Sequence, residues 1–201
     1  AFYYNYPRPM ATAERGYSDE AFIQEFRLVS QVGETFDWVA GYFYRDQDRS
    51  SYQNSLLRGF KQWWDAAYPT ATSAVISDQD YLYRQQENFK ESAIYGELTW
   101  NASDALSFTG GFRYFDDEAK TNVQQTTGLF SSFNVSSESV GNEKNDGTLF
   151  KGNVAWTFSP DNMFYGTISE GYRRGGTNGV PTEGTFAEDA SWSLYKPDEV
   201  T

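Results

Sequence analysis

The fold is decided by residues 89–115, which read FKESAIYGELTW, then NASDA, then LSFTGGFRYF. In both arms apolar and polar residues alternate with a period of two, the pattern of a β-strand whose faces meet different environments. The first arm places Ile94, Leu98 and Trp100 opposite Tyr95 and Glu97, and the short link between the arms is a compact turn of Asn, Ser and Asp residues. The stretch therefore predicts an antiparallel β-hairpin.

The same hairpin pattern occurs before and after this stretch. Residues 22–30 and 36–46 alternate around a short turn at 31–34, and Phe36, Trp38, Tyr42 and Tyr44 share one face of the second arm. Residues 149–158 and 163–173 alternate around the turn Ser159-Pro-Asp-Asn162. Six strands are therefore predicted, near residues 22–30, 36–46, 89–100, 106–115, 149–158 and 163–173.

The connections between these strands are sharply unequal. Tight turns alternate with long polar stretches near residues 47–88, 116–147 and 175–196, and residues 1–20 are expected to end another such loop. A soluble two-sheet sandwich has no reason for this asymmetry, whereas outer-membrane barrels have short periplasmic turns and long extracellular loops. Aromatic residues stand at both ends of the strands, as two interfacial girdles require, and lie at positions 36, 38, 42, 44, 100, 114, 156, 158 and 172.

These features predict an all-β fold, an antiparallel meander of about six long strands that crosses a membrane. Strands of about 9 to 11 residues are long enough to cross a tilted path through the bilayer. No apolar run approaches the roughly 18 residues of a membrane helix, and the first residues do not resemble a signal peptide. We therefore expect a piece of a longer exported protein.

Composition excludes several functions. The chain has no Cys and no His, which removes thiol nucleophiles, Cys/His zinc sites and His-based triads, so we expect no enzyme, no metal and no cofactor. Its net charge of −12 argues against nucleic acid as a partner. Aromatics form 18% of the chain although its mean hydropathy is −0.68, a combination typical of strands with one apolar and one wet face.

Four phrases, in order and spread over residues 22–201, resemble the β-barrel domain of TonB-dependent receptors, particularly the ferric-siderophore type. They are the hairpin from Phe22 to Tyr44, the pair AIYGE with LSFTGGFRY at 93–114, the segment DNMFY with EGYRRGGTN at 161–178, and YKPDE at 195–199. The family's barrel has about 22 strands, so six would be an incomplete segment of it, without the plug domain, the TonB box or the C-terminal strands.

The resemblance implies energised nutrient uptake across the outer membrane of a Gram-negative bacterium. The expected partners are TonB with its proton-motive-force complex, a ferric siderophore or another scarce nutrient, and outer-membrane lipid and lipopolysaccharide. Two alternatives stay open from the sequence. One is a passive porin or channel, and the other is a secreted carbohydrate-binding β-domain whose exposed aromatics would form a sugar platform.

Candidate ligand residues follow from position. Trp63 and Trp64 lie in the first long loop, where exposed indoles can stack on a ligand or, alternatively, pack the loop. Three inward-facing cations could attract an anionic chelate or pair with carboxylates such as Glu25 and Glu97, and they are Arg27, Arg45 and Arg113.

An acidic run and one isolated glutamate need separate interpretations. The run Asp116-Asp117-Glu118 could take a calcium ion or form a solvated rim at a strand end. Glu170 falls on an otherwise apolar face, so we expect it near the outer interface, where a charge costs little.

Overall fold

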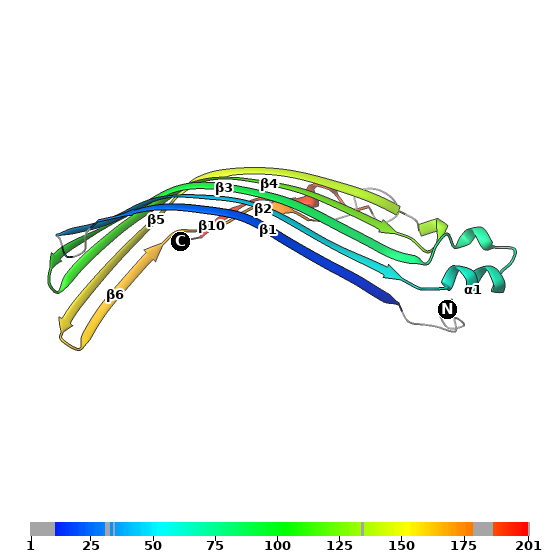
Figure 1. The fold of residues 1–201 in the computed structure, drawn as a ribbon, viewed down its shortest axis with the longest axis horizontal. Helices are drawn as coiled ribbons and strands as arrows, with labels where there is room; N and C mark the ends of the chain where they lie inside the picture. The colour runs from blue at the N-terminus through cyan, green and yellow to red at the C-terminus, as the bar shows by residue number, and fades with distance from the viewer. Residues whose placement is uncertain (1–10, 31–32, 34, 134, 179–186, 201) are drawn as a thin grey trace.

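The fold is one six-stranded antiparallel sheet, bent into an arch, in which every strand pairs with the next along the chain (Figure 1). The computed structural model describes residues 11–30, 33, 35–133, 135–178 and 187–200. The strands are β1 (Thr12–Val29), β2 (Phe36–Leu56), β3 (Gln79–Ser103), β4 (Leu106–Thr127), β5 (Val135–Ser159) and β6 (Asn162–Ser169). The sheet does not close on itself, which confirms the predicted open meander.

Short elements lie in the connections and after the sheet. The loop from β2 to β3 contains the helix α1 (Phe60–Ala67) and the 3-10 turn η2 (Thr72–Ala74), and the loop from β4 to β5 contains η3 (Ser131–Phe133). Beyond β6, β7 (Gly171–Arg173) pairs with β10 (Asp198–Val200), and β8 (Gly176–Thr177) pairs with β9 (Leu194–Tyr195) after η4 (Ala190–Ser193). Among the described residues, none of the helices is both long and apolar enough to cross a membrane.

The strands extend far beyond their predicted outer ends. β3 has 25 residues, about 80 Å at roughly 3.3 Å per residue, although about 9 to 11 residues cross a bilayer. Much of the predicted loops 47–88 and 116–147 is therefore strand, and β1 begins at Thr12, inside the predicted loop 1–20. Alternation does not predict these extensions because both of their faces are mostly polar, although the backbone pairing continues with a single register shift, between Ser55 and Leu56.

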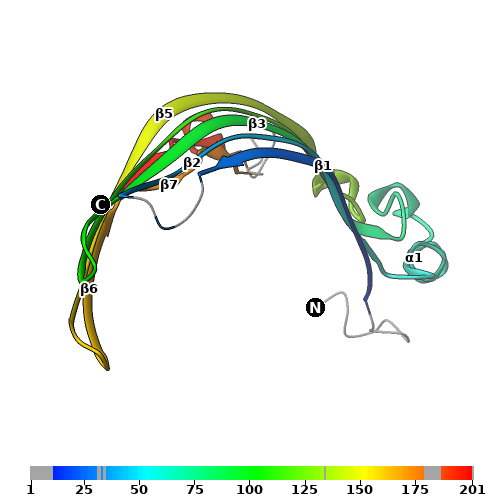
Figure 2. The same ribbon diagram turned by 60° about the vertical axis from the view of Figure 1, so that its left-hand side comes forward.

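The two faces of the sheet are identified by the segment that follows β6, which lies beneath the arch (Figures 1 and 2). The Tyr172 ring contacts the Phe115 ring at 4.5 Å, and Arg174 lies 3.0 Å from the Glu87 carboxylate. Phe115 and Glu87 therefore face the concave side. Strand alternation and the register place the other odd-numbered residues of the sheet on that side and the even-numbered residues on the convex side.

The convex face carries an apolar band across all six strands. Its large side chains are 41% to 69% exposed, and they include Phe22, Phe26, Leu28, Trp38, Tyr42, Ile94, Leu98, Trp100, Phe108, Phe112, Tyr114, Phe150, Trp156, Phe164 and Ile168. A continuous exposed belt of this size is a lipid-facing surface. A soluble sandwich would bury the same residues between two sheets, so the secreted carbohydrate-binding alternative does not fit.

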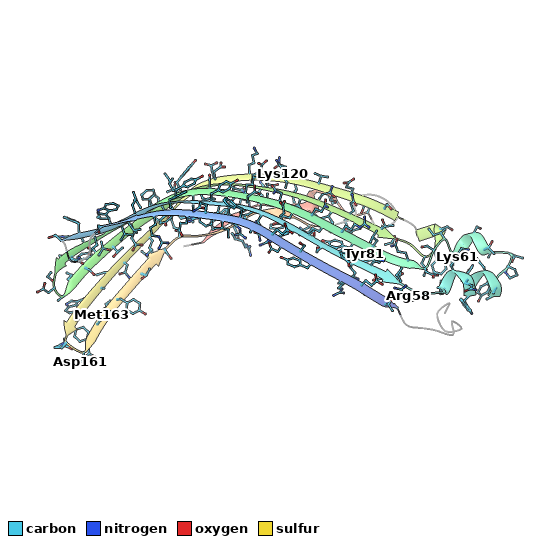
Figure 3. All side chains as sticks on the ribbon, viewed as in Figure 1. Arg58, Lys61, Tyr81, Lys120, Asp161 and Met163 are labelled. Carbon is cyan, nitrogen blue, oxygen red and sulfur yellow. The ribbon has the colours of Figure 1, made fainter. Side chains whose placement is uncertain are left out.

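Aromatic residues border the band at the end with the short turns. Trp100 stacks on Phe108 with ring centroids 5.8 Å apart, and Trp156 lies 5.5 Å from Phe158. Figure 3 shows Asp161 and Met163 at this end, opposite the end that carries α1. The short-turn end is therefore the predicted periplasmic side, and the long extensions with α1 lie outside the membrane.

Candidate functional site

The candidate site forms where the chain leaves the wall of the sheet after β6. The Glu170 amide donates to the Phe150 carbonyl at 2.9 Å, and the Glu170 carboxylate accepts from the Phe150 amide at 2.8 Å. This side chain takes the place of the next backbone carbonyl, so β6 ends at Ser169 and residues 171–177, the strap, turn beneath the arch. The predicted single strand 163–173, with Tyr172 in the outer girdle, is therefore wrong.

Glu170 itself lies nearer the middle of the apolar band than predicted. Phe150 pairs with Phe112 inside the apolar band, and Glu170 stands beside Phe150 rather than at the outer interface. The carboxylate is tolerated there because it accepts a hydrogen bond from a backbone amide that would otherwise be unpaired.

The strap and the concave face together line an open cavity of about 390 Å³. Its lining is rich in cations and rings and comprises Arg45, Arg49, Arg113, Arg174, Phe89, Phe115, Tyr172, Leu149, Glu91 and Asp117. Four guanidinium groups line the cavity with two carboxylates, and two further carboxylates, Glu87 and Asp19, pair with Arg49 and Arg174 beside it. Guanidinium groups in such a lining can donate hydrogen bonds to anionic oxygens in a fixed planar geometry.

Two arginines of this lining share one aromatic ring. Phe89 is 4% exposed, and the guanidinium carbons of Arg174 and Arg45 lie 4.2 Å and 5.4 Å from its ring centre. Arg45 also donates to Gln47, while its buried Nε has no hydrogen-bond partner among the described residues. A buried donor without an acceptor is costly, so Arg45 is suited to donate a hydrogen bond to an acceptor atom of a ligand.

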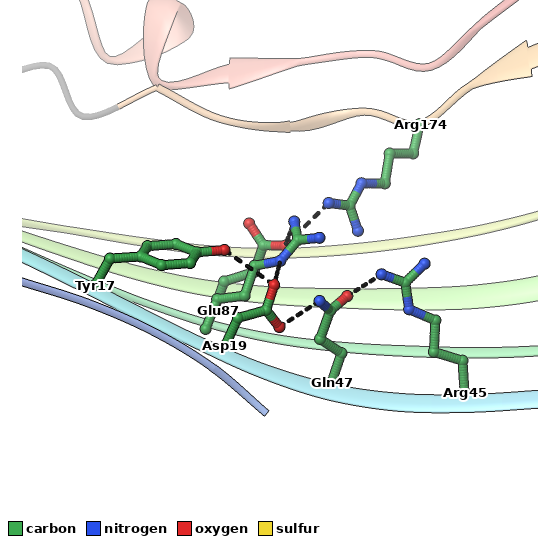
Figure 4. A network of polar contacts seen from close by, with 7 residues as sticks. Tyr17, Asp19, Arg45, Gln47, Glu87 and Arg174 are labelled. Atoms are coloured by element: carbon green, nitrogen blue, oxygen red, sulfur yellow. Dashed lines mark hydrogen bonds and ion pairs between the residues drawn. The ribbon is translucent and has the colours of Figure 1, made fainter. Parts of the chain in front are cut away.

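Arg49 and Arg174 are held by a common carboxylate. Glu87 lies 3.5 Å from Arg49 and 3.0 Å from Arg174, and Arg49 also lies 3.4 Å from Asp19 (Figure 4). The close-up shows Arg174 reaching from the strap toward side chains that rise from the sheet. This network fixes the strap to the extended part of the wall.

Asp117 is the most buried charged group of the cavity, at 3% exposure. Asn145 donates to one of its oxygens at 3.0 Å, and the Tyr172 hydroxyl donates to the other at 3.2 Å. Burial raises the pKa of Asp117, and burial together with the neighbouring Asp117 charge raises the pKa of Tyr172. The Tyr172 hydroxyl therefore keeps its proton and remains a donor.

The remaining predicted polar residues make their own contacts on the concave face, beside the cavity. Arg27 contacts Glu25 at 2.9 Å and donates to the Tyr95 hydroxyl at 3.2 Å, while Glu97 contacts Lys151 at 2.6 Å. Arg113, the third predicted cation, stands in the same row of the sheet as Arg27 and Tyr95 and contacts Glu91 at 2.5 Å. Of the three, only Arg45 and Arg113 line the cavity.

Trp64 does not present its indole to a ligand. It is 5% exposed in a loop core with Leu57, Phe60, Val75 and Leu129, and its Nε1 donates to the Ala71 carbonyl at 2.8 Å. Trp63 packs against this core while remaining partly exposed. For Trp64 the structure favours the alternative, packing of the loop, because the loop buries its own aromatic residues.

The acidic run at the end of the apolar band cannot converge on one ion. Alternation sends Asp117 into the concave cavity and Glu118 to the convex face, where Glu118 lies 3.2 Å from Lys120 and 3.6 Å from Lys144. The described residues contain no group of three Asp, Glu, His or Cys side chains that could hold a metal. The calcium alternative for residues 116–118 therefore finds no support.

Comparison with known proteins now decides the family. The family model described as TonB dependent receptor-like, beta-barrel matches residues 1–194. The chain belongs to the TonB-dependent receptor family. Its location is accordingly the outer membrane of a Gram-negative bacterium, and the passive-porin alternative is set aside.

Individual TonB-dependent receptors match this chain either over a shorter segment or at a lower sequence identity. It is 27% identical over 124 residues to the pesticin receptor of Yersinia enterocolitica and 26% identical to that of Yersinia pestis, over 62% of this chain and 17% of either receptor. The crystal structure of the ferric yersiniabactin uptake receptor FyuA from Yersinia pestis superimposes with a TM-score of 0.69 at 17% identity, over 94% of this chain and 26% of that one. The chain thus spans about a sixth of its curated relatives' length.

Sequence reasoning missed Arg49 and Arg174 as members of the receptor's candidate site. Arg49 continues the odd-numbered positions of Arg45, and following that parity past the predicted strand end would have found it. No such signal exists for Arg174, because the strap has left the sheet before this residue.

Proposed function

We propose that this barrel segment belongs to an active transporter that takes up a ferric siderophore, and that the concave cavity contacts the anionic chelate. The observation that carries the proposal is the convergence of four arginines and three aromatic rings on one cavity that faces the interior of the barrel. Transport, and not catalysis, is the activity we assign.

The lining suits the chemistry of an iron chelate. Carboxylate and phenolate oxygens of a chelate accept hydrogen bonds, and guanidinium groups donate to such oxygens in a fixed planar geometry. Phe89 packs against Arg174 and Phe115 packs against Tyr172, so these rings hold the lining side chains in place. Both residues are nearly buried, so their positions are set before a ligand arrives.

The similar proteins support the same class of ligand. One is called a ferric yersiniabactin uptake receptor and others are called pesticin receptors. We propose by analogy that the whole protein binds its ligand from the outside and that TonB, powered through the proton-motive-force complex, drives release through the barrel. The TonB contact would be made by parts of the protein outside this chain.

Uptake by the full-length receptor tests the proposal. Cells that express wild-type receptor, Arg45→Gln or Arg113→Gln are given ⁵⁵Fe-loaded yersiniabactin, catecholate, hydroxamate or citrate chelates one at a time. Arg84→Gln is the matched control, because Arg84 is an exposed cation of the convex face. For the transported chelate we expect each cavity variant to weaken binding by about 10-fold or more, the usual loss for a hydrogen bond to a charged group.

Two outcomes would overturn the assignment. Uptake of none of the ferric chelates by the wild-type receptor would exclude the siderophore class. Equal affinity of Arg45→Gln, Arg113→Gln and wild type for a transported chelate would remove this cavity from the binding path.

A further inference from the structure

Three successive concave positions of β2 carry Arg45, Gln47 and Arg49, so an uncharged amide stands between two arginines that line the cavity. The Gln47 side chain is buried, with the residue only 4% exposed. A buried amide needs a donor for its oxygen and an acceptor for its nitrogen, because unpaired buried polar groups are costly. The partners of Gln47 therefore show what this residue does in the site.

These partners fix the orientation of the Gln47 amide (Figure 4). Its Nε2 donates to the Asp19 carboxylate, and its Oε1 accepts from Nη2 of Arg45. Hydrogen bonds from Gln47 and Tyr17 hold the pKa of Asp19 below its usual range, so this carboxylate is ionised and only accepts. A guanidinium only donates, so a reversed amide would lose both bonds. Gln47 therefore presents its carbonyl oxygen to Arg45.

Carboxylates hold the arginines at the distal end of the cavity. Glu87 lies 3.5 Å from Arg49 and 3.0 Å from Arg174, so one carboxylate serves two guanidinium groups. Asp19 adds a second carboxylate, 3.4 Å from Arg49. An anionic ligand that pairs with either arginine must therefore compete with a carboxylate that is already in place.

Arg45 is held differently from the other arginines of the cavity. Its cross-strand neighbour is Glu91, but the Glu91 carboxylate contacts Arg113 at 2.5 Å. In the part of the chain that the structure describes, Arg45 makes no ion pair. Its guanidinium contacts the neutral Gln47 amide and lies 5.4 Å from the centre of the Phe89 ring. The Arg45 charge is thus supported without being neutralised by direct contact.

We propose that Gln47 is a positioning residue that holds Arg45 without neutralising it, so that Arg45 forms the ion pair with an anionic oxygen of the ligand. A carboxylate at position 47 would accept the same hydrogen bond but would also form an ion pair with Arg45. The other three arginines of the cavity are already paired and act as preset hydrogen-bond donors. The inference rests on the proposed function, because it requires the cavity to contact an anionic group of the ligand.

Binding to the purified full-length receptor tests the inference with two anions, the transported ferric chelate and inorganic phosphate. Phosphate pairs with guanidinium groups whether or not the receptor takes up iron chelates, so it separates this inference from the proposed function. The test variant is Asp19→Asn/Gln47→Glu, the exchange variant, which moves one carboxylate beside Arg45 at constant net charge. Asp19→Asn alone is its control.

We expect the exchange variant to bind both anions about 10-fold more weakly than wild type at low ionic strength, because its carboxylate occupies Arg45. Asp19→Asn alone should bind them at least as tightly as wild type, since Arg45 keeps its neutral partner. Added salt should weaken binding to wild type more than to the exchange variant, because only wild type forms this ion pair with the ligand. A merely distorted site would leave the salt dependence unchanged.

Gln47→Leu tests the positioning role separately. Without its acceptor the Arg45 side chain is no longer held in one orientation, so both anions should bind about 5-fold more weakly, with the salt dependence of wild type. Gln53→Leu is the matched control and should bind as wild type does, because it removes another amide of the same strand and face, one that donates to Ser55 at 3.2 Å. Amide exchange in the apolar band of β3 shows that each variant is folded.

Equal affinity of wild type and the exchange variant for phosphate would overturn the inference. So would a weakened exchange variant that keeps the salt dependence of wild type, or an equal loss of affinity in Gln47→Leu and Gln53→Leu. A wild-type receptor that shows the expected phosphate pattern but binds none of the ferric chelates would refute the proposed function and leave the role of Gln47 supported.

Discussion

Replacement of Trp64 by alanine would test whether the first long loop is a folded unit. Trp64 joins α1 to the chain after it through contacts with Phe60 and Tyr68, and it contacts Phe130 of the next loop with ring centroids 5.5 Å apart. The bridge between Val75 and Phe130 also connects the two loops. Loss of the indole should therefore loosen both loops together.

The size of the effect follows from burial. A tryptophan side chain that is 5% exposed buries roughly 200 Å², which at about 25 cal/mol per Å² contributes about 5 kcal/mol. The retained Cβ and partial collapse of the cavity reduce this value, and the lost hydrogen bond to Ala71 adds about 1 kcal/mol. We expect the free energy of loop opening to fall by about 4 kcal/mol, or to reach zero if the loop is less stable than that.

Hydrogen exchange of the full-length receptor measures this opening. The amides of Tyr68 and Ile76 report on the unit, because they donate to the carbonyls of Trp64 and Leu129 at 2.8 Å each. Their exchange should quicken by up to about 1,000-fold in Trp64→Ala, while amides in the apolar band of β3 keep their protection. Trp63→Ala is the matched control and should change exchange much less, since Trp63 remains partly exposed.

Unchanged exchange at Tyr68 and Ile76 in Trp64→Ala would refute the argument that the indole holds the two loops. An equal effect of Trp63→Ala would refute the argument from burial.

Three further substitutions test smaller parts of the structure by the same exchange measurement. Asp78→Ala removes the carboxylate that accepts from two amides at the start of α1, at 2.7 Å each, and should destabilise the helix by about 1–2 kcal/mol, whereas Asp80→Ala should not. Arg174→Gln removes a ring contact and an ion pair and should lower strap stability by about 1–2 kcal/mol, more than Arg173→Gln, whose side chain is 79% exposed. Because burial raises the pKa of Asp117, the folded state holds that proton more tightly than the unfolded state, so the free energy of strap opening should fall as pH rises from about 4 through the raised pKa, and Asp117→Asn should remove this dependence.

Each of these three has a contrary result. Equal helix protection in Asp78→Ala and Asp80→Ala would show that the cap contributes nothing. An equal loss of strap stability in Arg174→Gln and Arg173→Gln would show that exposure does not decide how much each arginine contributes. A strap that gains stability with rising pH would mean that the Tyr172 and Asn145 hydrogen bonds outweigh burial at Asp117.

The sequence by itself determined the membrane-spanning part of the sheet. Lipid on one side and a polar interior on the other impose a period of two, so alternation alone assigns Trp38 and Leu98 to the apolar face. Each strand also pairs with its chain neighbour, so the short turns at 101–105 and 159–162 define which strands meet. Local pattern and local pairing suffice for these features.

Only the tertiary structure decided the parts where local pattern carries no information. The extended ends of β2–β5 have polar residues on both faces, so the register propagated from the membrane part, and not alternation, keeps them as strands. Trp64 is buried by Phe130 of a neighbouring loop that is far away in sequence, a contact that composition does not reveal. The cavity depends on Glu170 ending β6 and turning the strap inward, which brings Arg174 beside Phe89. Such contacts between distant residues exist only once the chain has folded.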